Sequence, residues 1–338
     1  MNIATKVTPK IIATKDVSLD DKYISDYGSA YMTGIQALVR LPLAQTRRDS
    51  KNGYHTAGFI SGYRGSPVGN YDNFLWQIGG ILKDHNVVFQ PGINEDLAAT
   101  AIWGTQQANL ASQGKYDGVT AWWYGKGPGV DRSGDVLRHA NLAGTAEHSG
   151  VVALFGDDHS CKSSTVPHQS EHVMMGCGIP IFYPTSVQHI LDLGVHAVAM
   201  SRFAGVWTSM KLVSEIVETS ASVIVDLNRV TPVLPEIELP ADGIHIRWPD
   251  HGIQQEQRLY QYRLPAVLAY ARANQLNRIT WPCEHARIGI AASGKGYLDT
   301  IEALRILGIE NETAQQLGLR VYQVALIWPL EPQGLREF

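Results

Sequence analysis

The feature that most constrains this chain is a regular alternation of apolar, strand-like runs with segments of helical spacing. Six short apolar runs are typical of strands, at residues 56–61, 86–90, 118–125, 150–156, 179–184 and 205–213. Helical patterns lie between them, at 70–82, from 94 to about 114, at 135–144 and at 186–201. Continuous apolar strands suit a parallel sheet that is covered on both faces. The alternation therefore predicts a doubly wound α/β domain.

The pattern changes near residue 230, where a proline-rich stretch without periodicity begins. A helical stretch at 248–277 follows it. A strand at 285–294, a helix at 297–308 and a strand at 319–328 come next, which is too little to bury a core unaided. We expect the last strand to belong to a separate sheet. The predicted division is an N-terminal extension over 1–30 that is extended or loose, an α/β domain over 31–230, a connector over 231–285 and an incomplete second α/β domain over 286–338.

Composition and charge argue against several classes of protein. The net charge is −4, charged residues make up 18% and no long basic run occurs, which argues against nucleic acid or an anionic membrane as a partner. No apolar stretch is long enough to span a bilayer, and the start of the chain has no apolar signal core, so we expect a cytoplasmic protein. Cys161, Cys177 and Cys283 are too few and too widely spaced for a disulfide framework or an iron–sulfur cluster held by this chain alone.

Polar and glycine-rich loops follow each of the first four predicted strands. They read SGYRGSPVGNYD (61–72), PGINED (91–96), GKGPGVDRSGD (125–135) and GDDHSCKSSTVPHQSEH (156–172). In a doubly wound sheet, ligands bind at the carboxyl edge of the strands, where these loops converge. The sequence therefore predicts a site at this edge.

Each motif also has an interpretation without function. Glu95 and Asp96 could serve only as first-turn acids of a helix that Asn94 caps. The histidines and Cys161 of the fourth loop match no ligand spacing of zinc, and we expect no metal site there. The glycines of GKGPG do not form the GxGxxG fingerprint, which disfavours a dinucleotide-binding enzyme.

The motifs TAGFISGYRGSPVGNYD, INEDLAATAIWG, GKGPGVDRSGDVLRHANLAG and GDDHSCKSSTVPHQSEHVM resemble the N-terminal part of the indolepyruvate ferredoxin oxidoreductase family, in particular its bacterial form with fused subunits. This family belongs to the thiamine-diphosphate-dependent 2-oxoacid:ferredoxin oxidoreductases, and the resemblance covers residues 20–338. It implies a pyrimidine-binding domain followed by the start of a transketolase C-terminal-like α/β domain. The diphosphate-binding GDG motif is absent here. The resemblance therefore implies that Mg²⁺ and the [4Fe-4S] clusters belong to other parts of the enzyme.

The resemblance also implies roles for single residues. Glu95 is similar to the glutamate that hydrogen-bonds the thiamine aminopyrimidine and would be catalytic. Gly65, Ser66 and Pro67 match a loop over the pyrimidine and the substrate, and Gly127 and Gly129 match a loop near the reaction centre. Arg64 stands where many relatives have proline, so the resemblance gives it no role. On chemical grounds an arginine at this edge could hold the carboxylate of the substrate, beside Ser66, or it could be a surface residue. The acids Asp157 and Asp158 are expected to order their loop.

The predicted activity is the oxidative decarboxylation of an aryl 2-oxo acid such as indolepyruvate to an acyl-CoA. Coenzyme A and ferredoxin would be partners, together with the remaining domains or subunits, and we expect a homodimer of the full enzyme. The isolated chain should be inactive. The alternative is a catalytically silent fragment or assembly subunit of such a complex.

Overall fold

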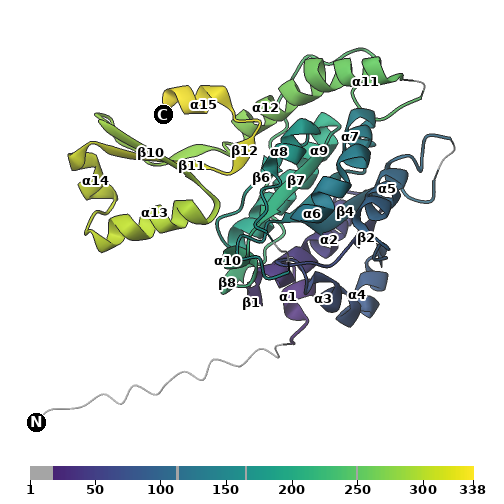
Figure 1. Cartoon of the computed structure of the whole chain (residues 1–338), viewed down its shortest axis with the longest axis horizontal. Coiled ribbons are helices and arrows are strands. Elements are labelled where there is room, and N and C mark those ends of the chain that lie inside the picture. Colours follow the sequence, from purple (N-terminus) through teal and green to yellow (C-terminus); the bar gives the residue numbers. More distant parts are fainter. Residues whose placement is uncertain (1–17, 112–113, 164–165, 249) are drawn as a thin grey trace, which may run out of the picture.

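The computed structural model describes residues 18–338, apart from 112–113, 164–165 and 249. A seven-stranded sheet forms its centre, in the order β12, β6, β7, β5, β4, β2, β3 (Figure 1). The strands are β2 (Thr56–Gly62), β3 (Val87–Phe89), β4 (Gly118–Lys126), β5 (Val151–Gly156), β6 (Ile181–Phe182), β7 (Trp207–Leu212) and β12 (Leu326–Trp328). All pair in parallel except β12, which is antiparallel to β6. The predicted doubly wound α/β class is confirmed.

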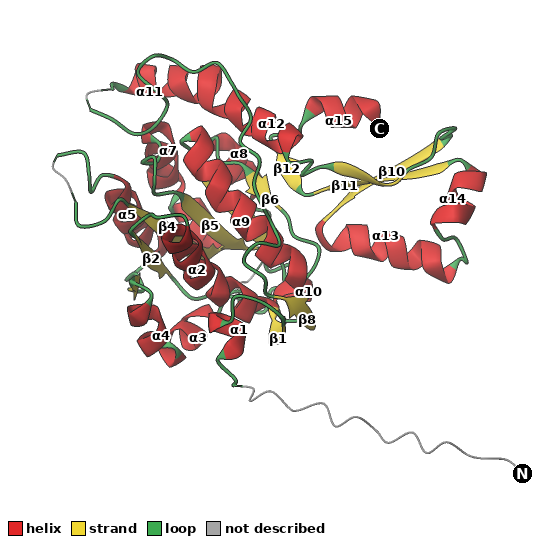
Figure 2. Ribbon diagram, turned by 180° about the vertical axis from the view of Figure 1, so that it is seen from behind, coloured by secondary structure: helices red, strands yellow, loops and turns green. Residues whose placement is uncertain are grey.

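Helices cover both faces of this sheet (Figure 2). One face carries α2 (Gly34–Lys51), α3 (Tyr71–Gln77), α4 (Gly79–Asp84), α9 (Val187–Ala204) and α12 (Leu264–Ala273). The other carries α5 (Glu95–Gln106), α6 (Gly127–Arg132), α7 (Gly134–Ala143) and α8 (Glu171–Gly176). Successive side chains of β4 point to opposite faces of the sheet. Trp122 and Tyr124 therefore pack against the first group of helices, and Trp123 packs against the second.

The start of the described chain is more ordered than expected. A short helix, α1 (Asp21–Ile24), precedes β1 (Ser29–Thr33), which pairs antiparallel with β8 (Ser220–Ile224) just after α10 (Ser214–Val217). In the described part of the range predicted to be extended or loose, α1 is the one departure, while residues 1–17 lie outside the described residues. The helix α2 begins at Gly34, where Thr33 and Gln36 form a capping box, and it continues through Pro42.

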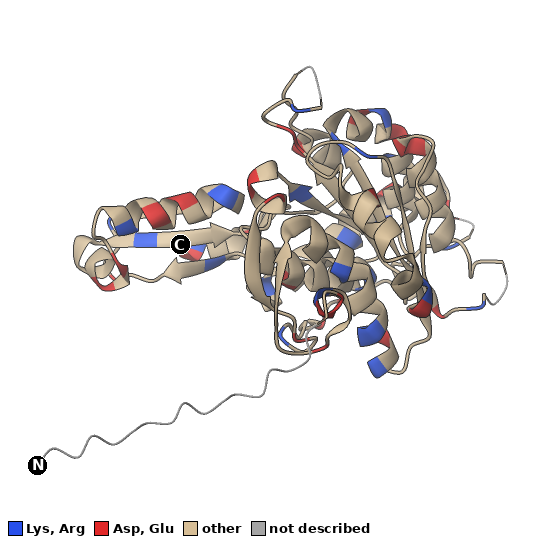
Figure 3. Cartoon of the chain, turned by 90° about the horizontal axis from the view of Figure 1, so that it is seen from below, with Lys and Arg blue, Asp and Glu red and all other residues tan. Residues whose placement is uncertain are grey.

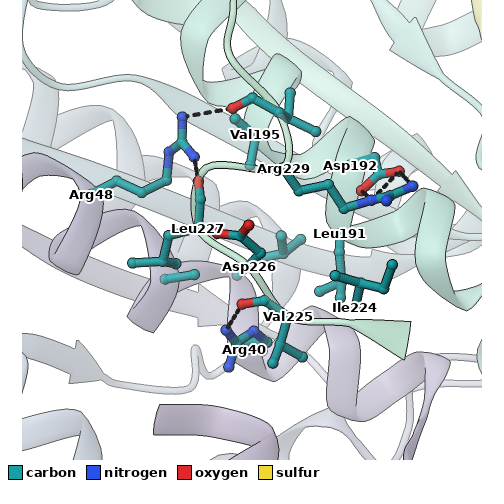
Figure 4. Close-up of a pocket in the computed structure, with 13 residues that line it drawn as sticks. Arg40, Arg48, Leu191, Asp192, Val195, Ile224, Val225, Asp226, Leu227 and Arg229 are labelled. Atoms are coloured by element: carbon teal, nitrogen blue, oxygen red, sulfur yellow. Dashed lines mark hydrogen bonds and ion pairs between the residues drawn. The ribbon is translucent and has the colours of Figure 1, made fainter. Parts of the chain in front are cut away.

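Arginines on α2 bind the chain that leaves β8 (Figure 4). Arg40 is buried and donates to the carbonyls of Lys22, Ser25 and Val225, and Arg48 donates to those of Leu227 and Val230. Arg229 pairs with Asp192 of α9 at 2.9 Å. Burial lowers the pKa of Arg40 to about 10. The amides of Val225 and Leu227 bond to the carbonyls of Gly28 and Asp26, and the arginines satisfy carbonyl groups of the same segment. These bonds together fix the entrance to the proline-rich stretch.

The end of the chain forms a smaller unit that projects from the larger one (Figure 3). Its sheet has the order β10 (Ile288–Ser293), β11 (Leu319–Val324), β9 (Arg278–Trp281), with α13 (Gly294–Ile306), α14 (Asn311–Leu317) and α15 (Pro332–Glu337) beside it. Along the chain, the two units are connected by α11 (Gly252–Arg258), a π-helical turn at Leu259–Arg263, and α12, which pack on the larger unit. Basic and acidic residues are interspersed over both units in Figure 3.

The predicted strand at 319–328 is divided between the two sheets. Its first six residues form β11 in the small sheet, whereas Leu326–Trp328 form β12 at the edge of the large sheet. The expectation that this strand stays outside the first sheet is therefore wrong for its last three residues. The physical reason is Asn277, whose side chain bonds to the backbone of Ala325 and Leu326 at 2.8–2.9 Å and holds the chain where it crosses from one sheet to the other.

Two histidines on α9 predict how the stability of the fold depends on pH. His189 Nδ1 accepts a hydrogen bond from the Thr185 amide at 3.2 Å, and His196 Nδ1 lies 3.0 Å from the hydroxyl of Tyr270. Burial lowers the pKa of each imidazole from 6.5 to about 4. Between these values the unfolded chain binds protons that the folded chain does not, so the free energy of unfolding should fall as pH drops through this window.

The measurement is denaturant unfolding at pH 7 and pH 5. The parent should lose more stability over this interval than His189→Gln, because the variant removes one of the two groups. His139→Gln is the control, since the His139 side chain is 60% exposed. Equal losses in the parent and His189→Gln would contradict the assignment.

Candidate functional site at the carboxyl edge of the sheet

The four polar loops meet at one edge because their strands are neighbours, in the order β3, β2, β4, β5. The chain passes from β2 to β3 on one side and then to β4 on the other side of β2, so the strand order reverses between β2 and β4. Such a switch point leaves a crevice at the carboxyl ends of the strands, where open α/β sheets bind ligands. Backbone bonds join the loops here, from Gly92 to Gly62 at 2.8 Å and from Tyr63 to Tyr124 at 3.0 Å.

The structure separates the roles of the two acids at the start of α5. Asn94 caps this helix by accepting from the Leu97 amide at 2.9 Å. Glu95 is 7% exposed, and its carbonyl accepts from Trp123 Nε1 at 2.9 Å. Within the described part of the chain, no hydrogen bond or ion pair reaches the Glu95 carboxylate. Asp96 instead pairs with Arg132 at 3.1 Å, with its side chain 38% exposed.

Glycines make room for the Glu95 side chain. A Cβ at Gly129 would lie 2.4 Å from Glu95 Cγ and 2.5 Å from its Oε1, and a Cβ at Gly125 would lie 3.3 Å from Cγ. The first of these distances is far shorter than a normal van der Waals contact, so any side chain at Gly129 would displace the carboxyl group. The buried, unpaired carboxyl group therefore depends on a glycine for its position.

The predicted loop residues Gly65, Ser66 and Pro67 lie against the same crevice. A Cβ at Gly65 would meet the side chain of Lys126 at 2.5 Å, and Pro67 packs on Gly156. The peptide bond between Ser66 and Pro67 is cis. The Ser66 amide donates to the hydroxyl of Ser163 at 2.9 Å, and Lys126 also donates to Ser163. The loops after β2, β4 and β5 are thus joined through one serine.

Gly127 opens α6 on the other side of Glu95. A Cβ there would lie 2.3 Å from the imidazole of His168, so the ring covers the backbone of this loop directly. His168 Nε2 is bonded to Asp131 at 2.7 Å. The absence of a side chain at Gly127 and Gly129 therefore lets His168 and Glu95 approach the backbone of the same turn closely.

Arg64 is the most exposed of the predicted site residues discussed so far. Its side chain is 69% exposed, and its Nε lies 3.5 Å from Oδ2 of the buried Asp72. Burial raises the pKa of the Asp72 carboxyl. The structure therefore places Arg64 at the carboxyl edge of the sheet. There it forms an ion pair with Asp72, which lies in the first turn of α3.

The acids after β5 make hydrogen bonds within their own loop. Asp157 accepts from the hydroxyl of Ser170 at 2.6 Å, and Asp158 accepts from the amide of Ser163 at 2.9 Å. Lys211, buried at the end of β7, pairs with Asp157 at 3.3 Å and also with Glu171. Burial raises the pKa of Asp157. Burial acts in the same sense on Glu171, but its interactions with Lys211, a backbone amide and Asp157 together outweigh burial and lower its pKa.

Sequence reasoning missed Lys126, Lys211 and Trp123. The signal for Lys211 was present, because it is a lone charge in an otherwise uncharged strand and therefore needs a buried partner. Nothing in the sequence indicated that Trp123 would bond to the backbone of Glu95. The described residues contain no group of three or more His, Cys, Asp or Glu side chains arranged to hold a metal ion. Among the described helices, none has the length and apolar character needed to cross a membrane.

Comparison with known proteins supports the resemblance drawn from the loop motifs. Residues 278–338 match the model of the indolepyruvate oxidoreductase domain. The chain is 23% identical over 286 residues to indolepyruvate oxidoreductase subunit IorA of Methanothermobacter thermautotrophicus, covering 83% of this chain and 41% of the relative. It is 24% identical over 261 residues to the subunit of the same name from Methanothermobacter marburgensis, covering 75% of this chain and 38% of the relative. The chain therefore spans about two fifths of the length of these relatives.

A solved structure shares the fold. It is a 2-oxoglutarate:ferredoxin oxidoreductase from Magnetococcus marinus, with a TM-score of 0.60 and 13% sequence identity, covering 90% of this chain and 55% of that chain. The match includes both units described above, since it extends over nine tenths of the chain.

Proposed function

We propose that this chain, which is an indolepyruvate ferredoxin oxidoreductase-family protein, supplies the pyrimidine-binding part of a thiamine-diphosphate-dependent enzyme. The observation that carries the proposal is Glu95. An acid that serves only a helix terminus has no need to be buried, whereas Glu95 is buried with an unpaired carboxylate in a space that Gly129 leaves open. Asp96 beside it is only partly buried and pairs with Arg132, as suits an ordinary first-turn acid.

The residues of the crevice fit the pyrimidine end of thiamine diphosphate. Glu95 would hold a proton between its carboxyl group and a ring nitrogen, since no described residue pairs with this carboxyl group and it faces the space that Gly129 leaves open. The backbone of Gly127 and Gly129 would approach the ring, because no Cβ intervenes. Gly65, Ser66 and Pro67 would cover it from the β2 side. When bound, thiamine diphosphate supplies the electron sink for decarboxylation.

The substrate in this proposal is an aryl 2-oxo acid such as indolepyruvate. Arg64 and Ser66 would bind it, because a guanidinium group suits a carboxylate and the Ser66 hydroxyl lies in the same loop. The complete enzyme would form an acyl-CoA from coenzyme A and pass electrons through [4Fe-4S] clusters to ferredoxin. Mg²⁺, the clusters and the diphosphate site would come from its other domains or subunits, and the full enzyme would act as a homodimer in the cytoplasm.

The test of this function is an assay of the complete enzyme for ferredoxin reduction. We expect reduction that requires an aryl 2-oxo acid, coenzyme A and thiamine diphosphate together. A complete enzyme that binds its partner subunits but fails to reduce ferredoxin with any 2-oxo acid supplied would instead support the silent assembly subunit.

A second prediction concerns the isolated chain. It should bind thiamine diphosphate weakly or not at all, because the diphosphate and its Mg²⁺ carry most of the charge by which proteins bind this cofactor, and this chain provides no grip for them. Isothermal titration calorimetry with Mg²⁺ present is the measurement. Micromolar binding by this chain, without any partner, would contradict the division of the site between domains.

A further inference from the structure

Below the loop that carries Arg64 lies a cluster of three buried polar side chains, Tyr71, Asp72 and Tyr124. The Tyr124 hydroxyl interacts with the Asp72 carboxyl, whereas the Tyr71 hydroxyl has no hydrogen-bond partner among the described residues. All three residues are at most 3% exposed, and the two tyrosine rings meet edge to face with centroids 5.1 Å apart. Unpaired polar atoms in a protein interior destabilise the fold, so a cluster of this kind indicates a role other than stability.

Among the described residues, the cluster makes an ion pair with Arg64, and the two partners differ strongly in burial. Asp72 has a side chain that is 4% exposed, whereas Arg64, its partner at 3.5 Å, is 69% exposed. Asp72 is approached by Nε of the guanidinium group, which is the nitrogen nearest the backbone. The two terminal nitrogens of Arg64 make no hydrogen bond to any residue that the structure describes. They therefore remain available at the surface of the crevice while the base of the guanidinium group is held.

This geometry suits recognition of a carboxylate. A guanidinium group is a planar fork, and its two terminal nitrogens can donate parallel bonds to both oxygens of a carboxylate. The Arg64 segment is also tied to the loop that leads to Glu95, through the bonds of Tyr63 to Tyr124 and of Gly92 to Gly62. A carboxylate on Arg64 would thus lie on the same edge as the proposed reaction centre.

We propose that Asp72 is a positioning residue that holds Arg64 by its Nε, so that the terminal nitrogens of Arg64 select substrates carrying a carboxylate next to the carbonyl group. This inference rests on the proposed function, because it concerns the same crevice and the same substrate. Asp72, in the buried cluster beneath the loop, would be the residue that keeps Arg64 at the edge. Burial raises the pKa of Asp72, whereas a backbone hydrogen bond, Arg64 and Tyr124 favour its charged form.

The test uses the complete enzyme and steady-state kinetics with a 2-oxo acid. Asp72→Asn keeps the size of the side chain and removes the charge that holds Arg64. We expect KM for the 2-oxo acid to rise roughly tenfold, the scale of one charge-assisted hydrogen bond, with kcat within a few-fold of the parent. Arg64→Lys keeps the charge but not the fork, and should raise KM by a similar factor.

A double-mutant cycle of Arg64 and Asp72 shows whether Asp72 positions the arginine or only packs in the interior. In an Arg64→Gln background, Asp72→Asn should raise KM no further, because there is no guanidinium group left to position. Asp135→Asn, a change in a 90% exposed side chain at the same edge, should leave KM and kcat as in the parent. Thermal melts of all variants accompany the kinetics. Should Asp72→Asn fail to fold, the KM values of Arg64→Lys and Arg64→Gln still test carboxylate binding by Arg64, because this side chain is exposed and its replacement should not disturb the fold.

Two outcomes distinguish this inference from the proposed function. If Glu95→Gln loses turnover but Asp72→Asn leaves KM unchanged, Asp72 only packs, and the inference is overturned while the function stands. The same holds if Asp72→Asn lowers the melting temperature and kcat without changing KM. If Glu95→Gln turns over normally, the function itself fails.

Discussion

Replacing Glu95 by glutamine in the complete enzyme should reduce turnover by about 10²–10⁴-fold, the usual contribution of a positioned acid–base group. The substitution keeps the size of the side chain, so the space beside Gly129 stays filled and the fold should persist. Affinity for thiamine diphosphate should change little, because the diphosphate would be held by another domain. Steady-state rates with an aryl 2-oxo acid, together with thermal melts, are the measurements.

Asp96→Asn is the matched control, because it changes the neighbouring acid of the same helical turn. Asp96 pairs with Arg132 near the surface, so its replacement should give near-normal turnover. If both acids served only the terminus of α5, the two variants would show similar small losses of stability and similar rates. Turnover by Glu95→Gln within a few-fold of the parent would support that simpler interpretation.

The largest loss of stability is expected from Lys211→Met. This change removes the buried ammonium group that faces Asp157 and Glu171 and leaves the buried Asp157 carboxylate without its cation. Breaking a buried ion pair by removing one partner typically costs about 3–5 kcal/mol. Because Asp157 also bonds to Ser170, the loop after β5 should loosen, and the Asp157→Asn/Lys211→Met double variant should recover part of the loss.

Lys162→Met serves as the comparison for this prediction. Lys162 pairs with Glu218, and both side chains are about half exposed, at 49% and 47%. Its melting temperature should match that of the parent, because solvent screens such pairs. Equal melting temperatures for Lys211→Met and the parent in a thermal denaturation series would show that the buried pair does not stabilise the fold.

The sequence predicted those parts of the fold that local pattern determines. The strands β4, β5 and β7 are continuous apolar runs, and α9 has clear helical spacing with a serine cap, so each was placed within a few residues. The pairing of β1 with β8 could not be predicted in this way, because the two strands are about 190 residues apart and neither is strongly apolar. The division of the strand at 319–328 depends on Asn277, a contact that no local pattern encodes.

The candidate site was predictable as a region but not in its geometry. Loop composition placed the four loops at one edge, because parallel strands end together. It could not tell which of two adjacent acids turns inward, since both occupy the first turn of the same helix. That distinction depends on Gly129 and Trp123, which reach Glu95 from other parts of the chain. In the same way, Arg64 could be placed in a loop, but its contact with Asp72 required the position of α3.

The short strand β12 has a mechanical consequence. Ala325 alone separates it from β11, and its pairing with β6 attaches the smaller unit to the larger sheet by backbone hydrogen bonds. A hinge between the two units would have to peel Leu326–Trp328 from that sheet and break the bonds of Asn277 to the same stretch. Opening for substrate entry is therefore expected within the loops at the carboxyl edge. The two units should move as one rigid body during turnover.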